Sequence, residues 1–331
     1  MKRLIFYLFI TIFTMILVNN VNAKTNNKEQ LAHTFSIVAR DKITGEMAVG
    51  VQSHWFSVGT LVSWGKSGVG VVATQSFVNP AYGPNGIKLM EKGKSATEVL
   101  DILVAKDDGK GFRQVAMLDV NGNVSAFTGK KCIESANHII GENYSVQANM
   151  MLNDRVVPAM SKAFEENSNL ELPERVLKVL KVAQVTGGDI RGRQSAALIV
   201  VNSKSVEYSW EDKKIDLRVD DSKNPLVEIE RLLKIHHAYE HMNNGDLAVE
   251  HNDMKLALKE YGSAEKLMPD NLEMKFWKAI ALANNKQIEE AIPLFKIVFN
   301  KDDNWRELTR RLPKSGLLEV SESDLKKILD L

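Results

Sequence analysis

Residues 34–52 constrain the fold more than any other stretch of the chain. Over residues 34–39, polar or β-branched residues alternate with apolar ones, and a period of two is the pattern of a β-strand. Residues 42–45 form a turn signal that ends in glycine, and residues 46–52 are a second strand-like run. The pattern predicts a β-hairpin, and therefore an antiparallel sheet at the start of the folded part.

The segments that follow have an order typical of an α+β domain. Strand-like runs lie at 61–64, 68–74, 113–120, 123–128, 195–201 and 206–210, and helical spacing at 87–91, 99–104, 156–166 and 173–185. Ser95 and Glu98 predict a capping box, Asn121-Gly122 predicts a type I′ hairpin turn, and residues 83–86 predict a turn. Because hairpins dominate, we expect antiparallel sheets with segregated helices over residues 34–222.

The first 33 residues are interpreted as targeting and removable segments. Lys2 and Arg3 precede an apolar run over residues 4–18, and residues 21–23 resemble a cleavage site, which together predict a signal peptide over 1–23. An uncleaved membrane anchor is the alternative. Residues 24–33 are polar and without period, as in a linker or pro-segment. We therefore expect an exported protein of the periplasm or the extracellular space.

Composition argues against several kinds of function. The formal net charge is +1, and a near-neutral chain lacks the basic surface that binds nucleic acid. Cys132 is the single cysteine, so an internal disulfide is impossible and a packing role is expected. His237 and His241 lie four residues apart but without the HExxH order of a zinc site. We expect no metal and no cofactor.

The C-terminal part, residues 223–331, has helical patterns throughout and an internal repeat. The pairs with a spacing of 34 are Ala257 with Ala291, Tyr261 with Phe295, and Ala264 with Val298. Thirty-four is the tetratricopeptide period, and alanine followed four residues later by an aromatic residue fits its second helix. Helices over 226–237 and 323–331 could cap two such units. A plain helical bundle is the alternative. Tetratricopeptide-like arrays bind segments of other proteins, so a protein partner is expected here.

Arginine and amide side chains are the candidate substrate-binding groups. Arg191 and Arg193 flank Gly192 just after Asp189, and arginine pairs can clamp a carboxylate. Alternatively, one arginine pairs with Asp189 and the other is solvated. Gln147 and Asn149 have the same strand parity, so both amides could face a substrate or an oxyanion. Gln75 and Asn79 are similar candidates, and for all four amides a role in satisfying turns is the alternative.

Several long motifs together resemble the bacterial family called domain of unknown function 1028. The motifs are TFSIVARD at 34–41, VQSHWFSVG at 51–59, GVGVVATQ at 68–75, NPAYGP at 79–84, YSVQANM at 144–150, GGDIRGRQSAA at 187–197 and LRVDD at 217–221. The resemblance extends over residues 34–235. That family is placed among the N-terminal nucleophile hydrolases, so the resemblance implies a four-layer αββα sandwich. Residues 68–100 also look distantly like the start of gamma-glutamyltranspeptidases, which hints at an amino-acid or peptide-like substrate.

The resemblance also implies a catalytic residue. Removal of everything before Thr34 would place a hydroxyl nucleophile and an α-amine base on one residue. Such enzymes hydrolyse amide bonds, and backbone or amide donors hold the oxyanion. We therefore expect an exported, self-processing amidohydrolase that acts on a small amide or peptide-like substrate and forms a homo-oligomer through its sandwich domain. The alternative is a non-catalytic envelope protein in which the helical repeat binds a partner and Thr34 is an ordinary strand residue.

Overall fold

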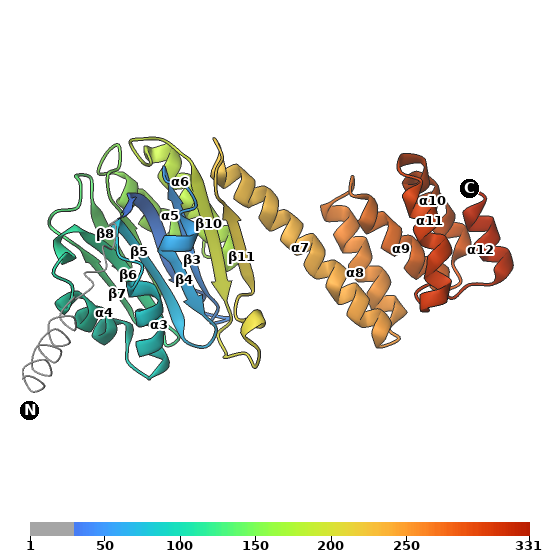
Figure 1. Cartoon of the computed structure of the whole chain (residues 1–331), viewed down its shortest axis with the longest axis horizontal. Coiled ribbons are helices and arrows are strands. Elements are labelled where there is room, and N and C mark those ends of the chain that lie inside the picture. The colour runs from blue at the N-terminus through green and yellow to red at the C-terminus, as the bar shows by residue number, and fades with distance from the viewer. Residues whose placement is uncertain (1–29) are drawn as a thin grey trace, which may run out of the picture.

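The structure is a computed structural model that describes residues 30–331 (Figure 1). The predicted signal peptide and most of the predicted linker lie outside these residues. Two antiparallel β-sheets form the N-terminal part and helices form the C-terminal part, which confirms the expected mixed organisation. Among residues 30–331, no helix is both long enough and apolar enough to cross a membrane.

One sheet has six strands in the order β11-β10-β3-β2-β9-β8. These strands are β2 (Thr34–Arg40), β3 (Met47–Ser53), β8 (Asn137–Gly141), β9 (Tyr144–Ala148), β10 (Ser195–Val201) and β11 (Ile215–Val219). The predicted hairpin pairs Thr34 with Ser53 and Arg40 with Met47. Because β2 pairs with β3 on one side and β9 on the other, Thr34 begins a central strand.

The other sheet has the order β1-β5-β6-β7, with β4 also paired to β5. Its strands are β1 (Gln30–Ala32), β4 (Ser63–Lys66), β5 (Gly70–Val78), β6 (Arg113–Asp119) and β7 (Val124–Thr128). β6 pairs with residues 70–76 along one edge of β5. β4 pairs with residues 70–73 and β1 with residues 76–78, so these two strands share the opposite edge.

Because side chains alternate along a strand, each sheet has one buried face toward the other sheet and one buried face toward helices. Val38 and Val49 of the six-stranded sheet share a buried cluster with Val71 and Ala73 of the other sheet. On the outer face of the six-stranded sheet, Phe35 and its neighbours pack on helices α5 (Val156–Glu166) and α6 (Leu172–Thr186). On the outer face of the five-stranded sheet, strand residues pack on α3 (Tyr82–Glu91) and α4 (Ala96–Ala105). Helices therefore cover the outside of both sheets.

Two predicted segments near α3 have a different structure. The strand predicted over residues 61–64 is only half correct: residues 61–62 belong to α2 (Gly59–Val62) and β4 begins at Ser63. The helix forms because Val58 and Val62, one helical turn apart, are both buried between the sheets. Residues 83–86 are not a turn but part of α3. Pro84 is the third residue of this helix, where its missing N–H costs no helical hydrogen bond.

Two further predictions need correction. The loop at Asn121-Gly122 joins a hairpin but is not a type I′ turn, because only Gly122 has a positive φ, +87°. The Asp119 carboxylate accepts hydrogen bonds from the main-chain N–H groups of Asn121 and Asn123 and holds this different loop. Residues 206–210 are not a strand; the exposed rings of Tyr208 and Trp210 stack at a short 3-10 helix, Ser209–Glu211. The strand that pairs with β10 here is β11.

The C-terminal part consists of helices packed in sequence order. They are α7 (Pro225–Glu250), α8 (Met254–Leu267), α9 (Leu272–Asn284), α10 (Ile288–Lys301), α11 (Asn304–Arg311) and α12 (Glu322–Leu329). The long helix α7 leads from the sheets to the other helices (Figure 1). All six residues of the 34-residue repeat are buried, so the repeated positions form the helical core.

Candidate active site

Thr34 lies where the chain passes from one sheet to the other. The preceding residues 30–32 belong to β1 of the five-stranded sheet, whereas Thr34 is the first residue of β2 in the six-stranded sheet. His33 joins the two strands, and both His33 and Thr34 are buried. By strand parity, Thr34 is on the same face as Ser36 and Val38, the face directed at the other sheet. The His33–Thr34 peptide bond is therefore enclosed between the two sheets.

Two side chains donate hydrogen bonds to the carbonyl oxygen of His33. Ser53 Oγ lies at 2.5 Å and Arg191 Nη2 at 2.8 Å from this oxygen. The next carbonyl, that of Thr34, accepts from the main-chain N–H of Asn149 at 3.1 Å and from Gln75 Nε2 at 3.2 Å. Both carbonyls that flank Thr34 are thus fixed by donors from four separate segments of the chain.

Asp189 fixes the orientation of Arg191. The guanidinium donates to both carboxylate oxygens, with Nε 3.0 Å from Oδ1 and Nη2 2.7 Å from Oδ2. The Asp189 side chain is fully buried, and it also accepts from the main-chain N–H of His54 at 3.1 Å. A bidentate pair holds the plane of a guanidinium as well as its charge. The positive charge beside the His33 carbonyl is therefore positioned before any reaction.

A buried network of amide side chains connects the two sheets beneath Thr34. Gln75 Nε2 donates to Gln114 Oε1 at 2.7 Å, and Asn149 Nδ2 donates to the same oxygen at 2.9 Å. Ser36 Oγ donates to Gln75 Oε1 and accepts from Gln147 Nε2, each at 2.7 Å. Because buried polar groups are costly unless paired, this network fixes the positions of its members.

The network also determines how His33 is bonded. Gln114 Nε2 faces the carbonyl oxygen of Ala148 at 2.9 Å, so Gln114 Oε1 must be the atom that accepts from Gln75 and Asn149. Asn149 therefore turns its Oδ1 to His33 Nδ1, 2.7 Å away, and Nδ1 carries the proton. Burial lowers the pKa of His33, which is consistent with a neutral ring that donates through Nδ1.

Two residues beside this network have unusual main-chain conformations. Ser76 follows Gln75 and has φ +75°, and Met150 follows Asn149 and has φ +59°. Positive φ in residues other than glycine costs about 1 kcal/mol or more, and such conformations concentrate at functional sites. They lie directly after the two residues whose amide groups hold the carbonyl of Thr34.

The structure does not bring every candidate residue to Thr34. Asn79 Oδ1 accepts from the N–H of Ala81 at 3.1 Å in the turn before α3. Arg193 is exposed, and its Nη1 donates to Asn224 Oδ1 at 2.9 Å. The Gln147 side chain is linked to Gln75 only through the Ser36 hydroxyl. Thr34, Gln75, Asn149, Asp189 and Arg191 are the predicted site residues that the geometry brings together.

Three residues of the site carried no sequence signal strong enough to select them. His33 and Ser53 lie at the ends of strands, and Gln114 is one glutamine between Arg113 and the apolar run at residues 115–118. Their roles depend on contacts between residues 20 to 158 positions apart. A buried polar residue inside a strand, such as Gln114, is the kind of signal that could have indicated this site.

Other candidate groups lie outside this site. Cys132 Sγ donates to the carbonyl of Arg113 at 3.4 Å, and burial raises the pKa of the thiol, which makes it a poorer nucleophile. Over residues 30–331, no group of three or more His, Cys, Asp or Glu side chains could hold a metal ion.

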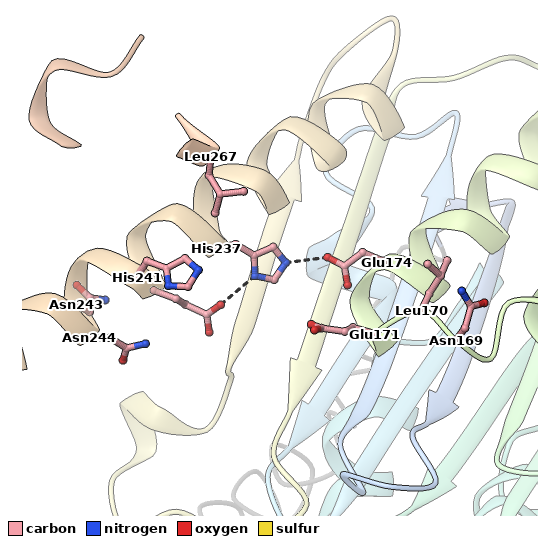
Figure 2. A pocket seen from close by; sticks show the side chains of 10 residues that line it. Asn169, Leu170, Glu171, Glu174, His237, His241, Asn243, Asn244 and Leu267 are labelled. Atoms are coloured by element: carbon pink, nitrogen blue, oxygen red, sulfur yellow. Dashed lines mark hydrogen bonds and ion pairs between the residues drawn. The ribbon is translucent and has the colours of Figure 1, made fainter. Parts of the chain in front are cut away.

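A separate open cavity of about 730 Å³ lies beside α6 and α7 and is lined by Glu174, His237 and His241, among others (Figure 2). His237 Nε2 is 2.8 Å from Glu174 Oε1, and His237 Nδ1 is 3.0 Å from Glu240 Oε2. The hydrogen bond with Glu174 raises the pKa of His237 to about 9. The contact with Glu174 joins α7 to α6 of the sheet domain, whereas the contact with Glu240 lies within α7. Neither contact involves Thr34.

Comparison with known proteins gives a family and a fold. The crystal structure of protein SPO2555 from Silicibacter pomeroyi, described as a member of the DUF1028 family, matches with a TM-score of 0.55 and 26% identity over 61% of this chain and 88% of that one. The ancestral beta-subunit Anbu from Yersinia bercovieri is also similar, with a TM-score of 0.32 and 10% identity over 60% of this chain and 92% of that one. The search of curated proteins gave no match.

A family model described as "Family of unknown function (DUF1028)" matches residues 34–229. The matched region begins at Thr34, the first residue of β2, and includes Arg191 and the amide residues of the buried network. The chain belongs to the DUF1028 family.

Proposed function

We propose that this protein is an exported amidohydrolase of the N-terminal nucleophile class, which cleaves its own His33–Thr34 bond and then uses Thr34 as the nucleophile. The observation that carries the proposal is the pair of donors, Ser53 Oγ and Arg191 Nη2, on the carbonyl oxygen of the bond to be cut. Donors at this oxygen stabilise the negative charge that develops when a hydroxyl adds to the carbonyl carbon.

Self-cleavage proceeds in two balanced steps. The Thr34 hydroxyl adds to the carbonyl carbon of His33, and the tetrahedral intermediate expels the Thr34 nitrogen, which takes up a proton. The result is an ester between His33 and Thr34 Oγ. Water then hydrolyses this ester, which leaves a carboxylate on His33 and restores the Thr34 hydroxyl beside the α-amine released in the first step. In the mature protein the same amine is the base for attack on substrate.

The neighbouring residues have positioning roles in this proposal. Gln75 and Asn149 hold the carbonyl of Thr34 and so fix the residue that carries the nucleophile. Arg191, oriented by Asp189, and Ser53 then stabilise the oxyanion of a substrate as they do that of His33. No metal or cofactor is required for these steps.

The layered arrangement supports the assignment to this class. Two stacked sheets with helices on both outer faces agree with the four-layer αββα sandwich of N-terminal nucleophile hydrolases. The central strand begins at the nucleophile, and the bond to be cut lies at its N-terminal end. This position allows a new N-terminus to form without removal of any residue from the six-stranded sheet.

The test of hydrolysis uses the protein purified with Thr34 as its first residue. We expect it to hydrolyse members of a panel of N-acyl amino-acid and peptide anilides. Thr34→Ser, which keeps a hydroxyl and an amine, should retain activity, whereas Thr34→Ala should lose roughly 10³-fold or more in kcat/KM. Equal hydrolysis by the Thr34→Ala protein would contradict the proposal.

A second candidate function is supported by the helical part. Gly245 packs against Tyr261, and 34 residues later Ala279 lies in α9 ahead of Phe295. A small residue in the first helix facing an aromatic residue in the second is expected of tetratricopeptide-like units. In this alternative the helices bind a protein partner, Thr34→Ala matures and functions normally, and neither the wild-type protein nor Thr34→Ala hydrolyses the anilides of the assay above. For either candidate we propose a homo-oligomer formed through the sheet domain.

A further inference from the structure

The residues before Thr34 occupy a strand position in the intact chain. β1 pairs antiparallel with the end of β5, with Gln30 opposite Val78, Leu31 opposite Phe77 and Ala32 opposite Ser76. β4 ends its pairing with β5 at Ala73. The edge of β5 over residues 76–78 is therefore covered by β1 and by no other strand of the described chain.

Cleavage after His33 would leave β1 attached by few contacts. It is a three-residue strand at a sheet edge, and strands this short are weakly held once the covalent connection is lost. Its departure would expose those main-chain N–H and C=O groups of residues 76–78 that are directed at β1. An exposed strand edge pairs readily with an extended peptide. The cut would thus produce a peptide-binding edge that leads directly to Thr34.

The pocket of His33 adds side-chain selectivity to this edge. The His33 ring is 1% exposed and meets the ring of Phe77 edge-on, with centroids 5.7 Å apart. Its Nδ1 donates to Asn149 Oδ1 at 2.7 Å. A flat ring with one N–H packs against Phe77 and donates to Asn149, whereas an aliphatic side chain would leave the Asn149 oxygen without this hydrogen bond.

We propose that the edge of β5 at residues 76–78, together with the His33 pocket, is the acyl-side subsite of the mature enzyme. It binds an extended peptide whose residue before the hydrolysed bond is histidine or a similar flat ring with an N–H donor. Residues 30–33 are the first occupant of this subsite and leave it as the product of self-cleavage. This inference rests on the proposed function and gives that activity a substrate class.

The test measures binding of a peptide to two forms of the protein. Calorimetric titration with acetyl-Gln-Leu-Ala-His is carried out on the mature protein, verified by mass to begin at Thr34, and on the uncleaved Thr34→Ala chain. We expect binding to the mature form only, because β1 occupies the subsite in the uncleaved chain. Replacing the peptide's histidine with alanine should weaken binding about tenfold, the effect of losing one buried hydrogen bond and a ring contact. N-methylation at one of the two central residues should also weaken binding, because it removes a strand hydrogen bond.

Variants of the protein test the pocket itself. Phe77→Ala should weaken binding about tenfold, and Phe77→Leu, which keeps most of the apolar volume, checks that any loss is not due to misfolding. Phe56→Ala is the matched control, because Phe56 is 62% exposed and should bind normally. Equal binding of a scrambled peptide, or equal binding to the uncleaved chain, would overturn the inference. A protein that begins at Thr34 but does not bind the peptide overturns this inference alone, whereas one that never begins at Thr34 overturns the proposed function as well.

Discussion

At the scale of single residues, Arg191 and Arg193 differ most clearly in their partners. Arg191 contacts Asp189 and the carbonyl of His33, whereas Arg193 contacts Asn224. The sequence left open whether both arginines clamp a substrate or one pairs with Asp189, and the structure shows the pair with Asp189. The sequence could not reveal that the Arg191 guanidinium also contacts the carbonyl of His33, because this contact depends on the tertiary fold.

We predict that Arg191→Met slows self-cleavage by about 10²- to 10³-fold, the usual effect of removing one oxyanion donor. The measurement is the rate at which the precursor mass disappears after synthesis. Arg193→Met is the matched control and should mature at the wild-type rate. Equal rates for the two variants would show that Arg191 does not act on the bond.

Gln114 is the residue on which the amide network depends. Its side chain accepts from Gln75 and Asn149 and donates to the carbonyl of Ala148. Gln114→Leu removes a hydrogen bond from each of these buried groups, so we predict a loss of about 2–4 kcal/mol in the free energy of unfolding. Urea denaturation measures this loss, and Gln194→Leu, which removes only a solvent-exposed hydrogen bond to Asp221, should change stability by less than about 0.5 kcal/mol. An equally small change in the free energy of unfolding for Gln114→Leu would contradict the role of Gln114 in the network.

At the scale of elements, predictions succeeded where one face of a segment is apolar and the ends have local signals. The Ser95–Glu98 capping box is present, with both of its hydrogen bonds. β5 was predicted too short, because Gln75 and Ser76 are polar yet buried inside the strand. Polar residues that are buried for a site interrupt the hydrophobic pattern. The end of β5, which holds Gln75, was missed for this reason.

The contact between α6 and α7 is predicted to depend on pH. In this contact, the hydrogen bond between His237 and Glu174 raises the pKa of His237 from 6.5 to about 9. The stabilisation from His237 is therefore complete below pH 6.5 and is lost as the pH rises through about 9. Burial disfavours the charged form of Glu174, but the hydrogen bond from His237 outweighs it and lowers the pKa of Glu174 below 4.5. Its contribution is present above pH 4.5 and is lost as the pH falls through that lowered value.

His237→Gln should therefore destabilise the protein at pH 7 but have little effect at pH 10. Because the pair is partly exposed to solvent, we expect a difference of only about 1 kcal/mol. Urea midpoints at the two pH values measure it. His251→Gln, at an exposed histidine, is the control and should not change the pH dependence. A His237→Gln effect as large at pH 10 as at pH 7 would rule out the charged pair.

At the scale of the whole molecule, the order of hairpins and helices was enough to predict antiparallel sheets followed by a helical region. Periodicity alone could not show which sheet each strand joins, because strands buried on both faces have no polar side. For the same reason, the sequence could not show that the chain passes from one sheet to the other at His33. This passage places the bond before Thr34 in an enclosed position between four polar segments, and the proposed chemistry depends on it.

The most direct measurement is the N-terminal mass of the protein recovered from its own host, compared with that of Thr34→Ala. We expect a wild-type chain that begins at Thr34 and a variant that retains the residues before it. Wild-type and variant chains that both begin at Lys24 would leave Thr34 without an α-amine and would contradict the proposed self-cleavage.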